Sequence, residues 1–145
     1  MFIFAHLFVG LIIGKISGSY LVALIGALFV DLDHLIVYVK NGILFKPKKL
    51  WKTITDANDP YGFQRNFLHN FFVWIIISIL ILIWDFRIGI IFSLAYLSHL
   101  LLDSLDGSDF YPFYPWKINV KGPIKYLSIQ EWTITLILLI AFIFI

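Results

Sequence analysis

The segment FVDLDHLIVYV, residues 29–39, places two aspartates and a histidine inside an otherwise apolar run. Hydrocarbon tolerates these side chains poorly, so ionisable residues within membrane helices mark binding sites or ion pathways. Asp31 and His34 are three residues apart and share one face of a helix. In a regular helix Asp33, two residues after Asp31, would point elsewhere. Either the helix breaks nearby, or the Asp33 carboxylate orients a histidine of the site from behind. We predict that this segment contributes to a metal site in a membrane protein.

The composition of the whole chain agrees with a membrane location. Of the 145 residues, 61% are hydrophobic and 14% are charged. Soluble domains carry about 25% charged residues, and a soluble fold of this size could not bury so much apolar surface. The sequence therefore predicts an integral membrane protein with one domain, residues 1–145. It contains no cysteine, which excludes disulfides and thiolate metal sites.

Apolar segments recur along the chain at lengths near the roughly 20 residues that a spanning helix needs. They are residues 2–14, 20–39, 67–84, 88–103 and 129–145. We predict an all-α bundle of about five transmembrane helices, of which the first and fourth are short. The N-terminal sequence MFIFAHLFVG has neither a basic region nor a small-residue cleavage site, so we expect a retained first helix.

Basic residues predict how this bundle is oriented. Nine of the eleven Lys and Arg residues lie in loops 40–66 and 104–128, and only Lys15 and Arg87 lie elsewhere. With five spans, both loops fall on the side of the N-terminus. The excess of Lys and Arg then places the N-terminus and both loops in the cytoplasm and the C-terminus outside.

On this topology every histidine and several acids lie at one depth, on the cytoplasmic side. The candidate metal ligands are His6, Asp31, Asp33, His34, His69, His99 and Asp103. His99 and Asp103 are four residues apart and share one helical face. Imidazole and carboxylate donors suit zinc best here, with manganese or iron as alternatives. Seven candidates exceed one tetrahedral site, so we expect one or two ions, and a pair about 3.5–4 Å apart would activate water against a phosphoester.

Three features outside this set have two interpretations each. Arg65 is either a cytoplasmic anchor or a guanidinium clamp for phosphate. The segment KNGILFKPKKLWK, residues 40–52, is either a solvated basic loop or an interfacial segment attracted to anionic lipid. The aromatic segment DFYPFYPWK, residues 109–117, could cover the site or anchor its loop at the level of the lipid head groups.

Four linked motifs resemble a known family. They are the early His6, DLDH at 31–34, QRNFLHN at 64–70, and YLSHLLLDSLDG at 96–107 followed by YPFYPW at 111–116. In this order they resemble the YdjM-like membrane-bound metal-dependent hydrolases, which are small multi-helix inner-membrane proteins. The resemblance runs from about residue 5 to 116. It implies that the seven candidates hold metal or orient its ligands, that Arg65 matches the motif arginine, and that zinc-dependent phospholipases C and single-strand nucleases are remote relatives.

The sequence also departs from the family pattern. Gln64 stands where the family often has the first histidine of its third motif, and Asp106 stands where threonine is usual and could return a carboxylate to the site. Other replacements are Val30 for proline, Asn66 for glycine, Leu68 for threonine and Asn70 for serine. These departures leave three alternatives to the family pattern: a different number of metal ions, an altered activity, or a lost activity.

These observations predict a membrane-embedded metal-dependent hydrolase, acting as a phosphoesterase on a lipid or lipid-linked phosphate at the cytoplasmic interface through metal-activated water. Arg65 would neutralise phosphoryl oxygens, and Asp33 or Asp106 would act as a base or as a supporting partner. The alternatives are a cation-binding transport or sensing protein and an inactive relative that retains a structural metal. Lipid is the expected partner. Nucleic acid is not, because the net charge is only +2.

Overall fold

The computed structural model describes residues 3–56, 61, 65 and 67–145. Its helices are α1 (Ile3–Ser17), α2 (Tyr20–Leu28), the 3₁₀ turn η1 (Phe29–Asp31), α3 (Leu32–Lys40), α4 (Pro47–Ile54), α5 (Phe71–Trp84), α6 (Phe86–Ser104) and α7 (Ile129–Phe144). No strand forms in the described residues, where an isolated bridge pairs Asp106 with Ile124. The predicted all-helical fold is confirmed.

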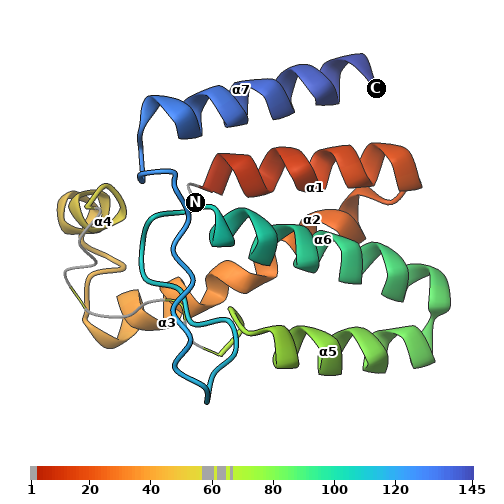
Figure 1. Ribbon diagram of the computed structural model, residues 1–145, viewed down its shortest axis with the longest axis horizontal. Coiled ribbons are helices and arrows are strands. Elements are labelled where there is room, and N and C mark those ends of the chain that lie inside the picture. Colours follow the sequence, from red (N-terminus) through yellow and green to blue (C-terminus); the bar gives the residue numbers. More distant parts are fainter. Residues whose placement is uncertain (1–2, 57–60, 62–64, 66) are drawn as a thin grey trace.

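Four helices, α1, α5, α6 and α7, run lengthwise side by side (Figure 1). α1 packs against α2, α6 and α7, and α6 also packs against α2 and α5. α2 and α6 approach closely at Gly26, where an added Cβ would lie 2.7 Å from the carbonyl oxygen of Phe92. Tyr96, Leu100 and Phe110 form part of the buried apolar core beside this contact. The centre of the bundle is therefore α6, which carries His99 and Asp103.

The number of membrane spans needs correction. Apolar helices form at all five predicted places, but in the described part of the chain only Tyr20–Lys40 and Phe86–Ser104 are long and apolar enough to cross a bilayer. The others, α1, α5 and α7, have 15, 14 and 16 residues. At about 1.5 Å per residue such helices are shorter than the roughly 30 Å hydrocarbon core. The first helix is short as predicted, but the prediction of a short fourth helix is wrong, because α6 has 19 residues.

The third apolar helix also starts later than predicted, at Phe71 rather than at residue 67. The Asn70 side chain caps it by accepting a hydrogen bond from the Phe72 N–H, so helical geometry cannot extend further back. Residues 67–70 are instead held against the site. The sequence pattern missed this because Phe67 and Leu68 are as apolar as the helix that follows.

A helix that was not predicted, α4, forms within the basic loop. Pro47 occupies its first turn, where a missing N–H has no consequence for the helix. The Thr53 side chain is buried, whereas Trp51 is exposed. The Tyr126 hydroxyl donates to the Ile54 carbonyl at 2.6 Å and ties the end of α4 to the chain before α7.

A candidate metal centre

Residues from α1, the α2–α3 junction, the start of α5 and the end of α6 meet at one end of the bundle. His6 comes from α1, Asp31 from η1, Asp33 and His34 from α3, and His99 and Asp103 from α6. His69 lies just before α5. A helix break near Asp33, one of the two alternatives predicted for this residue, is present at η1, and Asp31 and Asp33 both lie at this end of the bundle. The structure thus brings all seven predicted residues together.

The first group that could hold a metal ion comprises His6, His99 and Asp103. Its three side chains are fully or almost fully buried. His6 Nε2 lies 3.3 Å from Asp103 Oδ1, and His99 Nε2 lies 3.7 Å from Asp103 Oδ2. Ligand atoms around one tetrahedral zinc ion are about 3.3 Å apart, given zinc–nitrogen distances of about 2.0–2.1 Å. The spacing is therefore close to that of a coordination shell.

The second group comprises Asp31, His69 and His99, with ligand atoms within 4.8 Å of one another. His99 Nε2 lies 3.8 Å from Asp31 Oδ1. His69 Nε2 lies 3.4 Å from Asp103 Oδ2, which links this group to the first. His99 belongs to both groups, so the two describe neighbouring placements within one cluster.

Partners behind the cluster fix which ring nitrogens face it. His99 Nδ1 lies 2.7 Å from the Ala27 carbonyl oxygen and His69 Nδ1 lies 3.0 Å from Asp33 Oδ2. Carbonyl and carboxylate oxygens only accept, so both Nδ1 atoms donate. In the neutral imidazole each Nε2 then carries a lone pair turned toward the cluster, which is how proteins orient histidine ligands to metals.

The inward-facing nitrogens have no hydrogen-bond partner. This holds for Nε2 of His69 and His99 and for both ring nitrogens of His6, all of them buried. Burying a polar atom without a partner costs free energy, so such atoms need an explanation. A divalent cation beside Asp103 would accept these unpartnered lone pairs. The histidine and carboxylate donors fit zinc, manganese or iron.

Arg65 is held between two carboxylates. Its Nε lies 3.3 Å from Asp103 Oδ2 and its Nη2 donates to Asp106 Oδ2 at 2.7 Å. The pKa of Asp106 is below its ordinary value: burial alone would raise it, and the Arg65 guanidinium is among the positive charges that lower it. Backbone hydrogen bonds between residues 105–107 and 122–124 fix Asp106 in place. Arg65 therefore braces Asp103.

Asp33 also has a bracing geometry. Its Oδ2 accepts from the backbone N–H of Leu68 and of His69, at 2.8 and 3.2 Å, in addition to the His69 ring. Of the two roles predicted for this carboxylate, base or supporting partner, the contacts favour the second.

Asp31 and His34 line the accessible side of the cluster. Their side chains are about one-quarter exposed, and His34 Nε2 lies 3.8 Å from Asp31 Oδ1. The His34 ring is perpendicular to that of His69, with centroids 5.3 Å apart. This side is the accessible one, because His6, His99 and Asp103 are buried within the bundle.

Two contributors were not predicted from the sequence. The first is the Ala27 carbonyl, a backbone group whose role in orienting His99 does not depend on residue type and so cannot be predicted from it. Tyr96, one turn before His99, is buried and donates from its hydroxyl to the Leu68 carbonyl. The hydroxyl of a tyrosine within an apolar helix needs a hydrogen-bond partner, so Tyr96 could have been predicted to contact a polar group of the site. Gln64 and Asn66, at which the chain departs from the family pattern, lie outside the described residues.

The aromatic segment after α6 packs against the start of α5. The rings of Phe71 and Phe113 stack at 5.3 Å, and the Asn70 side chain donates to the Tyr114 carbonyl at 2.9 Å. These contacts support residues 67–70 from behind. The segment therefore packs on the start of α5, and its two predicted roles, covering the site or anchoring its loop at the level of the lipid head groups, stay predictions.

The model of one protein family, described as YdjM inner membrane protein, matches residues 2–145. The chain belongs to the YdjM inner membrane protein family. No curated protein and no solved structure matches it. Membership and the two helices of spanning length support the predicted membrane location of this YdjM family member. The suggested kinship with phospholipases C and single-strand nucleases is not confirmed by these comparisons.

Proposed function

We propose that this YdjM family member is a metal-dependent hydrolase that cleaves a phosphoester, most favourably of a membrane lipid, at the cytoplasmic face. The observation that carries the proposal is the set of buried imidazole nitrogens without hydrogen-bond partners, gathered around Asp103. Proteins avoid such atoms unless a ligand completes them. A structural metal alone would not require the accessible edge formed by Asp31 and His34.

The ion would be held by His6, His69, His99 and Asp103, with Asp31 at the accessible edge. His99 has one nitrogen to offer, because its Nδ1 is engaged by the Ala27 carbonyl. One nitrogen binds one metal, so the two groups are two placements of a single ion. A divalent cation here would supply a Lewis acid and permit ionisation of water near neutral pH.

The other residues of the site position these donors. Asp33 orients His69, and Arg65 with Asp106 holds the Asp103 carboxylate toward the histidines. Arg65 is buried, with its charge directed at these two acids. The predicted role of Arg65 as a phosphate clamp is therefore replaced in this proposal by a bracing role. His34 is the residue best placed to exchange a proton with a substrate.

The distribution of buried charge favours a one-sided site over an ion pathway. Each buried ionisable residue that the structure describes lies at the end of the bundle where α1 and α7 begin and α6 ends. A pathway would need such groups at successive depths. The proposed orientation places this end in the cytoplasm, with a multi-pass arrangement in which the shorter helices cross a locally thinned bilayer.

Metal content tests the proposal. We expect about one equivalent of zinc, manganese or iron in the purified full chain, and loss of that metal in His99→Ala. Asp109→Ala, which removes an exposed carboxylate that pairs with Lys121 and belongs to neither group of candidate ligands, should retain it. Release of head group or phosphate from phosphatidylcholine, phosphatidylglycerol and phosphatidic acid should be abolished by a chelator and restored by the metal. A folded protein that binds none of these metals contradicts the proposal, and metal without hydrolysis indicates a structural ion.

A further inference from the structure

Basic and aromatic side chains share the exposed face of α4. Lys48, Trp51 and Lys52 are spaced i, i+3, i+4 and so lie on one side of the helix. All three are exposed, and Trp51 has 65% of its surface accessible. Phe45, just before the helix, is 92% exposed. Exposed Trp and Phe among lysines are typical of a segment that lies in the head-group region of a bilayer.

The orientation of α4 matches such a location. Figure 1 shows α4 end-on, whereas α1, α5, α6 and α7 are seen along their lengths. Helices that cross a membrane run roughly along its normal, so α4 would lie in the plane of the interface. It sits beyond the end of the bundle that carries the metal centre (Figure 1). The hydrogen bond from Tyr126 to Ile54 holds it there.

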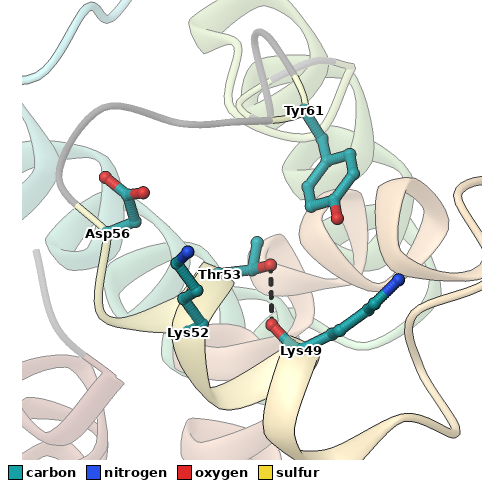
Figure 2. Close-up of a pocket in the computed structure, with 5 residues that line it drawn as sticks. All are labelled: Lys49, Lys52, Thr53, Asp56 and Tyr61. Atoms are coloured by element: carbon teal, nitrogen blue, oxygen red, sulfur yellow. Dashed lines mark hydrogen bonds between the residues drawn. The ribbon is translucent and has the colours of Figure 1, made fainter.

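A surface pocket adjoins the helix. It has a volume of about 250 Å³ and is lined by Lys49, Lys52, Thr53, Asp56 and Tyr61. Figure 2 shows the Lys49 and Lys52 side chains projecting from α4 beside the space that Tyr61 closes from the other side. The two ammonium groups outnumber the single Asp56 carboxylate, and together with the Tyr61 phenol they suit the phosphate of a lipid head group.

We propose that Phe45 and α4 form an interfacial anchor that binds anionic lipid head groups through Lys48, Lys49 and Lys52. The anchor would enrich anionic lipids at the mouth of the metal centre. This inference depends on the membrane location of the family and not on the proposed hydrolysis. Lysines near an anionic bilayer surface contribute to binding, and the aromatic rings insert beside them.

The test uses the natural absence of cysteine. A polarity-sensitive fluorophore on Phe45→Cys reports the depth of the anchor in the full chain, reconstituted in nanodiscs of phosphatidylcholine with or without phosphatidylglycerol. We expect a lipid-borne quencher to quench the label more, and aqueous acrylamide to quench it less, when phosphatidylglycerol is present. The triple variant Lys48→Gln, Lys49→Gln, Lys52→Gln should lose this difference.

A matched variant separates the anchor from general attraction of positive charge. Lys117→Gln, Lys121→Gln, Lys125→Gln removes the same charge from exposed positions in the other basic loop. It should keep the response to phosphatidylglycerol, and circular dichroism should show unchanged helix content in both variants. The proposal is overturned if the label is equally open to acrylamide in both lipids, if the response survives without the α4 lysines, or if both variants lose it equally.

Discussion

Gly26→Ala tests whether the packing of α2 on α6 sets the geometry of the metal centre. The added Cβ would lie 2.7 Å from the carbonyl oxygen of Phe92 and 2.9 Å from the Ala95 Cβ. Ordinary contacts begin near 3.4 Å, so the helices must separate by about 0.7 Å, and overpacking of this kind costs about 1–3 kcal/mol. Ala27, the next residue, accepts from His99 Nδ1 at 2.7 Å. The same displacement would lengthen that hydrogen bond to about 3.4 Å, beyond the usual range.

The expected result is a lower unfolding temperature together with reduced metal retention, measured by thermal unfolding in detergent and by elemental analysis. Gly89→Ala is the matched control. Its Cβ would lie 2.6 Å from the Leu82 backbone, an equally tight contact at the opposite end of α6. It should lower stability without changing metal content. The reasoning fails if Gly26→Ala keeps its metal while losing stability to the same extent as Gly89→Ala.

Three further substitutions test single contacts. Asp33→Asn should weaken metal binding about 10–100-fold, as for other partners that orient a histidine ligand, because it removes the charge behind His69; unchanged affinity in a metal titration would refute this. Asn70→Ala should lower the free energy of unfolding by about 1 kcal/mol through loss of the α5 cap, whereas Asn70→Ser should restore most of it. Lys121 lowers the pKa of the exposed Asp109 through a 2.6 Å ion pair, so any stability from this pair is present above the ordinary aspartate pKa and lost as pH falls through the lowered value. Carboxyl NMR should show this pKa rising in Lys121→Gln, and a pKa that does not move would contradict the assignment.

The sequence allowed prediction of the apolar helices and of the residues that meet at the site. Runs of apolar residues identified all five apolar segments, although only two of the helices that they form reach the length that a bilayer requires. The shared site of His6, His69 and His99 was predicted from an order of five spans, whereas only two described helices are long and apolar enough to cross a bilayer. Isolated ionisable residues are expensive in hydrocarbon, so their shared depth indicated one site.

The remaining features depend on tertiary contacts. Whether Arg65 clamps phosphate or braces a carboxylate depends on Asp103 and Asp106, which are far from it in sequence. Asn70 caps α5, and the backbone N–H groups of the two residues before it donate to Asp33, which is far from them in sequence. α4 is too short and too polar for hydrophobicity to indicate it within a charged loop.

The tightened turn at η1 has a consequence for mutational surveys of this family. Ala27 lies in the last turn of α2, directly before η1. Its carbonyl oxygen accepts from His99 Nδ1, so part of the site's specification resides in the main chain. Replacing the Ala27 side chain would reveal only steric effects, because its methyl group packs closely on α1. This methyl group lies 2.8 Å from the position that a Cβ on Gly10 would take. The orienting role would emerge only from changes that alter the course of the backbone, such as shifting the register of the turn by one residue.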